Sequence, residues 1–424
     1  MHKFSPKRGM KVAIIGSGIS GLSATYALHQ AGHDVTLYEK NDYLGGHSRT
    51  IDIDEKNKKI PVDTGFIVFN YRNYPHLTAL FDHIGVAVEK SDMSFGVYIN
   101  KGWLQYSSKN VLRRIQNIIR PQYWKMLLDI VKFNKNAAFY LNKSTDITIR
   151  QCLDELGMGQ WFRNYYLQAM GAAIWSCPIS KIENFPAKTF IRFFENHGLL
   201  TVNDQPQWYT VTGGSREYIK KITAKFQDRI KLSTPVTSVQ SANNKVIVTS
   251  GDSEEIYDHV IFACHADQAM KILKSPAPEQ KEIIGSFTYQ DNKIVVHRDM
   301  EYMPADRSCW ASWIYLSESL SDDSSNVSLS YWMNNLQNFK TEKPVIITLN
   351  PPNMPKPELI DDVHFFDHPI FDRVAIEAQE KIEQAQGHGN CWFVGAYQRY
   401  GFHEDGILST ARVLKKMDIK IPWK

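Results

Sequence analysis

Residues 11–40 join a buried-strand pattern to a glycine-rich turn and then to a helix: KVAIIGSGISGLSATYALHQAGHDVTLYEK. The apolar run Val12–Ile15 has the length and the β-branched content of a strand inside a parallel sheet. Glycines follow at positions 16, 18 and 21, apolar residues recur at helical intervals from Leu22 to Gln30, and VTLYE supplies a second strand. This order of strand, glycine turn, helix and strand predicts a dinucleotide-binding unit.

Each glycine of this turn has its own physical reason. Gly16 permits the tight turn, Gly18 lets a pyrophosphate approach the backbone, and Gly21 lets helix and strand pack closely, while the helix N-terminus offers N–H groups to the phosphates. Glu39 ends the second strand, where an acid accepts hydrogen bonds from a ribose and disfavours NADP. An ordinary glycine-rich turn is the weaker alternative. The expected contacts are Gly16, Ser17, Gly18, Ile19, Ser20, Gly21, Glu39 and Lys40.

Bulk composition excludes several classes of protein. A chain of 424 residues is longer than one core usually grows, so we expect two domains. A net charge of +4 is too small to indicate nucleic-acid binding. The five cysteines are widely spaced, with no pair for a metal, and are typical of reduced cytosolic thiols. No apolar run approaches membrane-spanning length, so we expect a cytoplasmic protein without a secretion signal or a transmembrane helix.

A second glycine motif follows in residues 40–50, KNDYLGGHSRT. Gly45, Gly46, Arg49 and Thr50 resemble the second signature of the large FAD-binding class that includes amine oxidases and phytoene desaturases, in which an Arg follows the glycine pair directly. Here His47 takes that place, which leaves open whether His47 or Arg49 reaches the pyrophosphate. An ordinary loop is the alternative, because glycine pairs mark turns everywhere.

Further segments match the same class in the same order. VDTGFIVFN (62–70) resembles the strand and turn that pass the flavin ring, TPVTSVQ (234–240) the strand whose valine touches adenine, HVIFACHADQAMKIL (259–273) the returning strand and helix, and the terminal WFVGAYQRYGFHEDGILSTARV (392–413) the closing strand and helix. The resemblance implies FAD contacts at Thr64, Gly65, Phe66, Val236, Ala263, Gly395, Gly406, Ile407 and Leu408, the last three at the start of the final helix.

Other stretches resemble a bacterial branch described as flavin-containing amine oxidase-like or NAD/FAD-binding oxidoreductases, often encoded beside cyclopropane-fatty-acid-synthase-like proteins. These stretches are AAIWSCP (172–178), HGLL (197–200), WYTVTGGSREYI (208–219), SLSYWMNNLQ (328–337) and GFHEDG (401–406). The resemblance covers nearly the whole chain and specifies the cofactor better than the substrate.

The implied fold is α/β: a discontinuous Rossmann-like FAD-binding domain with an amine-oxidase-like substrate domain of mixed sheet and a helical insertion. We expect residues 9–75, 205–275 and 388–424 in the FAD domain and residues 76–204 and 276–387 in a substrate or lid domain. FGVYINKGWLQY alternates around a turn like a hairpin. KIVVH, CWASWIYL, VSLSYWM and PVIITLN are typical of successive strands.

One dinucleotide fingerprint is present, whereas an enzyme that reduces its flavin with NADPH commonly carries two. We therefore expect the substrate to deliver a hydride to flavin N5 and the electrons to leave to oxygen, a quinone or another carrier.

The candidate bases for a reaction that also releases a proton are His403 and Glu404. The equally weighted alternative is that HED caps the last helix, where acids are favoured. Lys293 could match the lysine that holds a water on N5 in amine oxidases, although an exposed lysine is the stronger interpretation. Phe402 falls one residue away from the aromatic-cage position of amine oxidases. Tyr397 and Tyr400 either line the substrate site or pack.

Residues 101–143 contain nine basic residues and the single acid Asp129, a net charge of +8, interleaved with aromatic and aliphatic residues. A basic helix with an apolar face is how a peripheral protein sits on anionic lipid. A solvated basic face over a core helix is the alternative. On the first hypothesis the protein is peripheral at the inner membrane face.

Three functions remain open. The first is an FAD-dependent oxidoreductase that oxidises or desaturates a lipid acyl or isoprenoid chain. The second is an amine oxidase that releases hydrogen peroxide, and the third is a non-catalytic FAD-binding protein. The partner is a small-molecule or lipid substrate, with no nucleic acid and no metal, and the sequence leaves the oligomeric state open.

Overall fold

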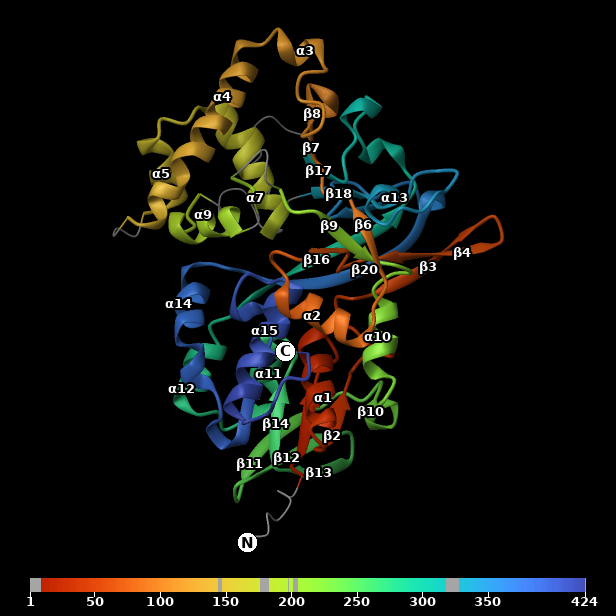
Figure 1. Ribbon diagram of the computed structural model, residues 1–424, viewed down its shortest axis with the longest axis vertical. Helices are drawn as coiled ribbons and strands as arrows, with labels where there is room; N and C mark the ends of the chain where they lie inside the picture. The colour runs from red at the N-terminus through yellow and green to blue at the C-terminus, as the bar shows by residue number, and fades with distance from the viewer. Residues whose placement is uncertain are drawn as a thin grey trace.

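The computed structural model describes residues 9–143, 147–175, 183–196, 198–200, 205–317 and 328–423. Residues 176–178 of AAIWSCP and residue 197 of HGLL lie outside the described residues. Figure 1 shows a parallel sheet with its covering helices at one end of the molecule and a group of helices at the other. Between them lies a large mixed sheet. Among the described residues, no helix has both the length and the apolar character needed to cross a bilayer.

A five-stranded parallel sheet collects strands from distant parts of the chain, in the order β10-β2-β1-β14-β21. β1 is followed by α1 (Ile19–Gln30), as the glycine motif predicts. Strands far apart in sequence therefore lie side by side, although the expected division into two domains stays a prediction. The strand bounds are β1 Lys11–Ile15, β2 Asp34–Tyr38, β10 Ile230–Lys231, β14 His259–Phe262 and β21 Cys391–Phe393.

Two apolar layers cover this sheet. One face packs against helices through residues such as Leu22, Tyr218 and Leu414, and the covering helices are α1, α2 (Pro75–Ile84), α10 (Arg216–Thr223) and α15 (His403–Lys416). The other face carries helices α11 (Ala266–Ile272), α12 (Pro278–Ile284) and α14 (Arg373–Lys381) and a sheet of β11 (Ser238–Ala242), β12 (Lys245–Ser250), β13 (Ser253–Tyr257) and β15 (Leu273–Lys274).

A seven-stranded mixed sheet separates these layers from the distal helices, in the order β20-β16-β19-β18-β17-β7-β8. The expected hairpin and four later strands all form and join this one sheet, whereas the long strand β20 was not predicted. The bounds are β7 Phe95–Ile99, β8 Leu104–Ser107, β16 Tyr289–His297, β17 Trp313–Ser317, β18 Ser328–Trp332, β19 Ile346–Leu349 and β20 Ile360–Pro369.

Two small sheets connect the layers: β3 (Thr50–Glu55) with β4 (Lys58–Asp63), and β5 (Val68–Asn70) with β9 (Trp208–Val211) and β6 (Val88–Ser91). The distal helices share an aromatic core that contains Phe133, Phe162 and Phe190. These helices are α3 (Ile115–Ile118), α4 (Pro121–Asn136), α5 (Ile149–Glu155), α6 (Gln160–Phe162), α7 (Gln168–Trp175) and α9 (Ala187–Asn196).

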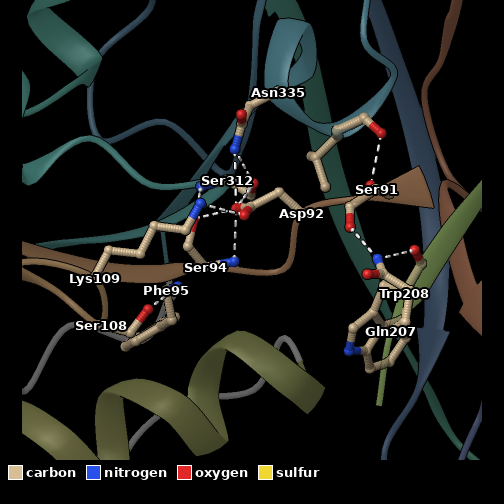
Figure 2. A network of polar contacts seen from close by, with 11 residues as sticks. Ser91, Asp92, Ser94, Phe95, Ser108, Lys109, Gln207, Trp208, Ser312 and Asn335 are labelled. Carbon is tan, nitrogen blue, oxygen red and sulfur yellow. Dashed lines mark hydrogen bonds and ion pairs between the residues drawn. The ribbon is translucent and has the colours of Figure 1, made fainter. Parts of the chain in front are cut away.

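A polar network around Asp92 fixes the start of the β7–β8 hairpin (Figure 2). The Asp92 carboxylate accepts hydrogen bonds from the Ser312 hydroxyl at 2.8 Å and the Asn335 amide at 2.9 Å, and it pairs with the Lys109 ammonium. Burial acts to raise the pKa of Asp92, but the Lys109 ammonium and the Ser94 hydroxyl outweigh it and hold the pKa at about 2. The hairpin that leads into α3 and α4 is thereby tied to the large sheet.

Two expectations about where elements begin, one strand and one helix, are corrected by the structure. TPVTSVQ becomes a strand only from Ser238, because Ser233 and Thr234 turn back to donate hydrogen bonds to the carbonyl oxygens of Asn41 and Glu39. The last helix begins at His403 rather than at Gly406. The segment HED therefore forms the first turn of the helix instead of preceding it.

The crossing of β1 and α1 leaves no room for a side chain at Gly21. A methyl group there would lie 1.9 Å from the Gly16 carbonyl oxygen and 3.2 Å from the Ala263 Cβ. We predict that Gly21→Ala lowers the free energy of unfolding by about 3 kcal/mol, since the overlap is with backbone that cannot move freely. Urea denaturation of the FAD-free protein measures this, because a change in FAD affinity would also change the stability of the loaded protein. The matched control is Gly18→Ala, where a Cβ meets nothing within 4 Å and a change of at most about 1 kcal/mol is expected. Equal losses in the two variants would contradict the packing argument.

Candidate functional site

The glycine turn and Glu39 form one hydrogen-bonded unit. The Ser17 backbone N–H and hydroxyl both donate to the Glu39 carboxylate, at 2.9 and 2.6 Å, and the Asn41 N–H donates at 2.9 Å. Glu39 is 5% exposed, whereas Lys40 is on the surface. The acid that was expected to meet a ribose is thus fixed in position by the turn itself.

The second glycine pair borders this turn. A Cβ on Gly46 would lie 3.3 Å from the Gly18 Cα, and the Gly45 N–H donates to the Ser17 carbonyl at 3.0 Å. Gly18 precedes α1, whose first turn has no acidic residue and whose N-terminus has no side-chain cap. The open space at Gly18 and the backbone N–H groups of the first turn of α1 form a cradle. A side chain at position 18 would fill this cradle, and its size and polarity fit a pyrophosphate.

His47 and Arg49 point to different partners. The Arg49 guanidinium forms a bidentate pair with Asp362 on β20, at 2.8 and 3.1 Å, and also donates to the Thr64 hydroxyl at 3.4 Å. His47 stacks on Phe366 with ring centroids 4.6 Å apart, and its Nε2 is buried without a hydrogen-bond partner. Because Arg49 already has a carboxylate partner, His47 is the residue of the two with a free polar atom beside the glycine segment.

A buried carboxylate, Asp63, joins three of the motifs that carry the family resemblance. It accepts from the Thr50 hydroxyl at 2.5 Å, from the Ser215 N–H at 2.8 Å and from the Gln337 amide at 3.0 Å. Burial raises the pKa of Asp63 to about 6, despite these donors. The expected cofactor residue Thr50 therefore has a structural partner that ties VDTGF to GGSREY and to NNLQ.

Three distant segments converge at His403. The Phe66 ring stacks on the His403 imidazole with centroids 3.7 Å apart, and the Phe66 N–H donates to the His47 carbonyl at 2.8 Å. The Ser48 hydroxyl lies 2.7 Å from His403 Nε2 and 2.5 Å from the Tyr218 hydroxyl. Burial lowers the pKa of His403 to about 3, so the ring is neutral at physiological pH.

The two acids of HED have separate capping contacts. The Glu404 carboxylate accepts from the backbone N–H groups of His76, at 3.0 and 3.1 Å, and Leu77, at 3.0 Å, so it caps the N-terminus of α2. Asp405 accepts from the Phe402 N–H at 3.0 Å, at the start of its own helix. Burial raises the pKa of Glu404 to about 7 and that of Asp405 to about 6. These contacts favour capping for both acids, but only Asp405 caps the last helix as the sequence suggested, whereas Glu404 caps α2.

The later glycines bring the two chain ends together. A Cβ on Gly406 would lie 2.9 Å from side-chain atoms of Ile19 and Ser20, so the backbone of α15 packs directly on side chains at the start of α1. The Gly406 N–H donates to the Phe402 carbonyl within the helix, at 3.1 Å. Because α15 starts earlier than expected, Gly406, Ile407 and Leu408 lie past its first turn, and their N–H groups do not form its open end.

The remaining expected contacts lie around the same turn. Gly65 passes so close to His47 that a Cβ would lie 2.1 Å from the His47 carbonyl oxygen, and the Ala263 carbonyl oxygen lies 2.8 Å from a Cβ built on Gly16. Val236 is half-buried in the loop that bonds to Glu39. The Gly395 N–H donates to the Ser409 hydroxyl at 2.8 Å, and Tyr397 packs beneath Gly395.

Lys293 does not match the amine-oxidase lysine. It pairs across the sheet with Phe365 and shares that outer face, where Phe365 is 58% exposed. The neighbouring pair Asn292 and Phe366 lies on the opposite face, which packs against His47. Because side chains alternate along a strand, Lys293 faces away from the expected cofactor.

A cluster of imidazoles beside His47 was missed in the sequence. The rings of His265 and His368 lie 5.9 and 5.3 Å from that of His47, and His265 Nδ1 is buried without a hydrogen bond. Burial lowers the pKa of His265 to about 4 and that of His368 to about 3. The alternation of His364, Phe366 and His368 in β20 was the available signal. Two unpaired ring nitrogens leave donors or acceptors for a polar cofactor.

Comparisons with known proteins agree with this geometry. A model of the family "Flavin containing amine oxidoreductase" matches residues 19–298. Amine oxidase [flavin-containing] B of Bos taurus is 24% identical over 281 residues, which cover 62% of this chain and 52% of that protein. A probable zeta-carotene desaturase of Synechococcus elongatus is 38% identical over 77 residues, 18% of this chain and 15% of that protein. The match thus spans about half the length of the bovine relative.

Solved structures share the fold over nearly the whole chain. Cyclohexylamine oxidase from Brevibacterium oxydans IH-35A superposes with a TM-score of 0.70 at 15% identity, covering 97% of this chain and 100% of that chain. A CLA-producing fatty acid isomerase from P. acnes superposes with a TM-score of 0.67 at 15% identity, covering 98% and 100%. The expected α/β fold class and the FAD cofactor are confirmed. The chain belongs to the flavin containing amine oxidoreductase family.

Proposed function

We propose that the protein uses bound FAD to oxidise or desaturate an uncharged lipid chain, of the acyl or isoprenoid class. The observation that carries this proposal is that the imidazoles clustered beside the glycine turn are uncharged. Burial lowers the pKa of His47 and His403 to about 3, and that of the neighbouring His265 to about 4. Neutral imidazoles and a stacked phenylalanine favour an apolar substrate over a cationic amine, because no fixed charge of theirs offsets the desolvation of an ammonium group.

Aromatic side chains continue the apolar character toward the distal helices. Phe193 of α9 stacks on Phe402 with centroids 5.4 Å apart and meets Tyr400 edge-on at 5.6 Å. Trp313 and Tyr331 face each other across β17 and β18 at 4.8 Å. Such surfaces exclude water and bind hydrocarbon by area. Phe402 therefore serves as apolar lining in this proposal, without the aromatic cage of an amine oxidase.

FAD, when bound, accepts the hydride of the substrate and passes the two electrons on to an acceptor such as oxygen or a quinone. A substrate that loses a hydride and a proton gains a carbon–carbon double bond. Of the two candidate bases, Glu404 has both oxygens bound to α2, whereas His403 has a neutral ring beside the Ser48 hydroxyl. A base with so low a pKa accepts a proton once hydride departure has made the adjacent C–H acidic.

The comparisons support this proposal and also supply a second candidate. The fold accommodates a lipid chain in a protein described as a fatty acid isomerase. Amine oxidation is the alternative, because the sequence match includes amine oxidase B.

Anaerobic absorbance spectroscopy separates the two functions. Holoenzyme mixed with membrane lipid extract is expected to lose its oxidised-flavin absorbance, while a panel of primary and secondary amines leaves the spectrum unchanged. Bleaching by an amine, with hydrogen peroxide released on admission of air, would replace lipid oxidation by amine oxidation. A spectrum that neither class changes would contradict both.

Gly18→Ala tests the nucleotide cradle. The added methyl meets no protein atom within 4 Å, so the chain is expected to fold normally, but the methyl occupies the approach to the pyrophosphate. We expect FAD affinity to fall at least about tenfold, which a flavin fluorescence titration measures. The control is Gly32→Ala at the far end of α1: its Cβ meets no atom within 4 Å, but its φ of +81° makes Ala strained there, so a loss of stability is expected while FAD affinity should not change. Unchanged affinity in Gly18→Ala would place the pyrophosphate elsewhere.

Glu404→Gln tests capping against catalysis. The native pKa is raised to about 7, so this carboxyl stabilises the fold below its unfolded pKa, and that contribution is lost as pH rises toward about 7. Relative to wild type, the variant should therefore gain about 2 kcal/mol between pH 5 and pH 8, measured by urea denaturation. Turnover should be kept, whereas His403→Gln should lose about 100-fold with its flavin still bound. Parallel pH profiles would contradict the raised pKa of Glu404, and loss of turnover in Glu404→Gln would contradict a purely capping role.

A further inference from the structure

Exposed apolar side chains gather on one part of the distal helices. Among the described residues, fifteen large apolar side chains are exposed, and seven of them lie between positions 112 and 139. Single exposed apolar residues are ordinary, but a cluster of this kind marks a surface that contacts something else. The seven are Leu112, Ile115, Ile119, Trp124, Leu128, Val131 and Phe139.

Helix α4 carries two apolar stripes on different faces. Tyr123, Met126 and Phe133 are fully buried in the core. Leu128 and Val131 are 69% and 61% exposed, and together with Trp124 they follow a spacing of four and three residues. Residues at this spacing lie on one face of a helix. The buried stripe accounts for the folding of α4, and the second stripe has no partner among the described residues.

Helix α3 extends the exposed stripe. Ile115 and Ile119 are four residues apart and 67% and 72% exposed. The Trp124 indole N–H donates to the Ile118 carbonyl at 2.7 Å, which holds the start of α4 against the end of α3. We call Leu112, Ile115, Ile119, Trp124, Leu128 and Val131 the α3–α4 face. Figure 1 shows α3 and α4 at the end of the molecule far from the parallel sheet.

The exposed charges of residues 101–143 are all positive, and Asp306 is the acid that interacts with Arg113 and Arg114 from outside this range. In residues 101–143 the one acid, Asp129, is buried and accepts the Gly159 N–H at 2.9 Å. Lys109 is neutralised by Asp92, but Arg113, Lys125 and Lys135 are exposed without an ion pair to any described residue. A second copy of the chain would bring like charges together, whereas an anionic bilayer offers both negative headgroups and hydrocarbon.

We propose that the α3–α4 face docks on an anionic lipid bilayer, with its apolar side chains at the acyl boundary and its cations among the headgroups. This rests on the proposed function in one respect: the membrane is then the source of the lipid chain that the enzyme oxidises. Docking itself requires no turnover. It is an interfacial contact and leaves the nucleotide cradle at the opposite end of the molecule in water.

Vesicle flotation of the FAD-loaded protein tests the docking. The probes are vesicles of phosphatidylcholine alone and of phosphatidylcholine mixed with phosphatidylglycerol. Wild type is expected to float with the anionic vesicles only, and high salt should release it. Ile119→Ser/Leu128→Ser and Lys125→Gln/Lys135→Gln are each expected to lower the bound fraction about tenfold. The matched control is Ile256→Ser/Val374→Ser, whose side chains are 59% and 56% exposed on other elements.

Several results would overturn the docking. One is equal flotation on neutral and anionic vesicles, and another is equal loss in the control variant. A third is a dimer in light scattering that Ile119→Ser/Leu128→Ser dissolves, because a second copy would then be the occupant. The flavin spectrum of each variant shows whether the fold and the cofactor remain. Flotation without bleaching by lipid would leave the docking in place and defeat lipid oxidation, and bleaching without flotation would do the reverse.

Discussion

The close approach of three backbone segments holds the nucleotide end of the molecule together. Gly21 passes the Gly16 carbonyl, Gly46 borders Gly18, and Gly406 crosses Ile19 and Ser20 at distances that leave no room for a Cβ or almost none. These contacts place the start of the chain, the second glycine motif and the last helix around one small cradle. The sheets and helices farther away position this crossing and cover it.

The protonation states of the imidazoles near the cradle depend more on burial than on nearby charged partners. The carboxylates of Glu39, Glu404 and Asp405 each accept backbone N–H groups, and Arg49 is bound by Asp362. The imidazoles next to them are neutral because desolvation disfavours the charged form. The charged groups near the glycine turn therefore have structural partners, while the imidazoles of His47 and His403 beside them are uncharged.

Local sequence patterns predicted the fold well where the structure of a segment depends only on residues close to it in sequence. The strand, glycine turn and helix of residues 11–30 and the hairpin around Lys101 needed only neighbours in sequence. Long-range contacts decided the rest. No residue near Arg49 in sequence indicates that Arg49 pairs with Asp362. The direction of the Lys293 side chain likewise depends on the pairing of its strand with Phe365. The start of α15 at His403 depends on the hydrogen bond from the Phe402 N–H to Asp405. The sequence prediction placed the start at Gly406 because it considered the glycine and not this bond.

The order of strands in the parallel sheet has a consequence for synthesis on the ribosome. β21 and α15 are the last elements of the chain, yet α15 covers α1, the first helix, through residues such as Ile407 and Leu414. Until α15 has been made, the part of α1 that α15 covers stays exposed, although α10 can already pack on another part of it. Folding of the nucleotide end therefore requires that α15 has left the ribosome, and chaperones can bind the earlier segments until then.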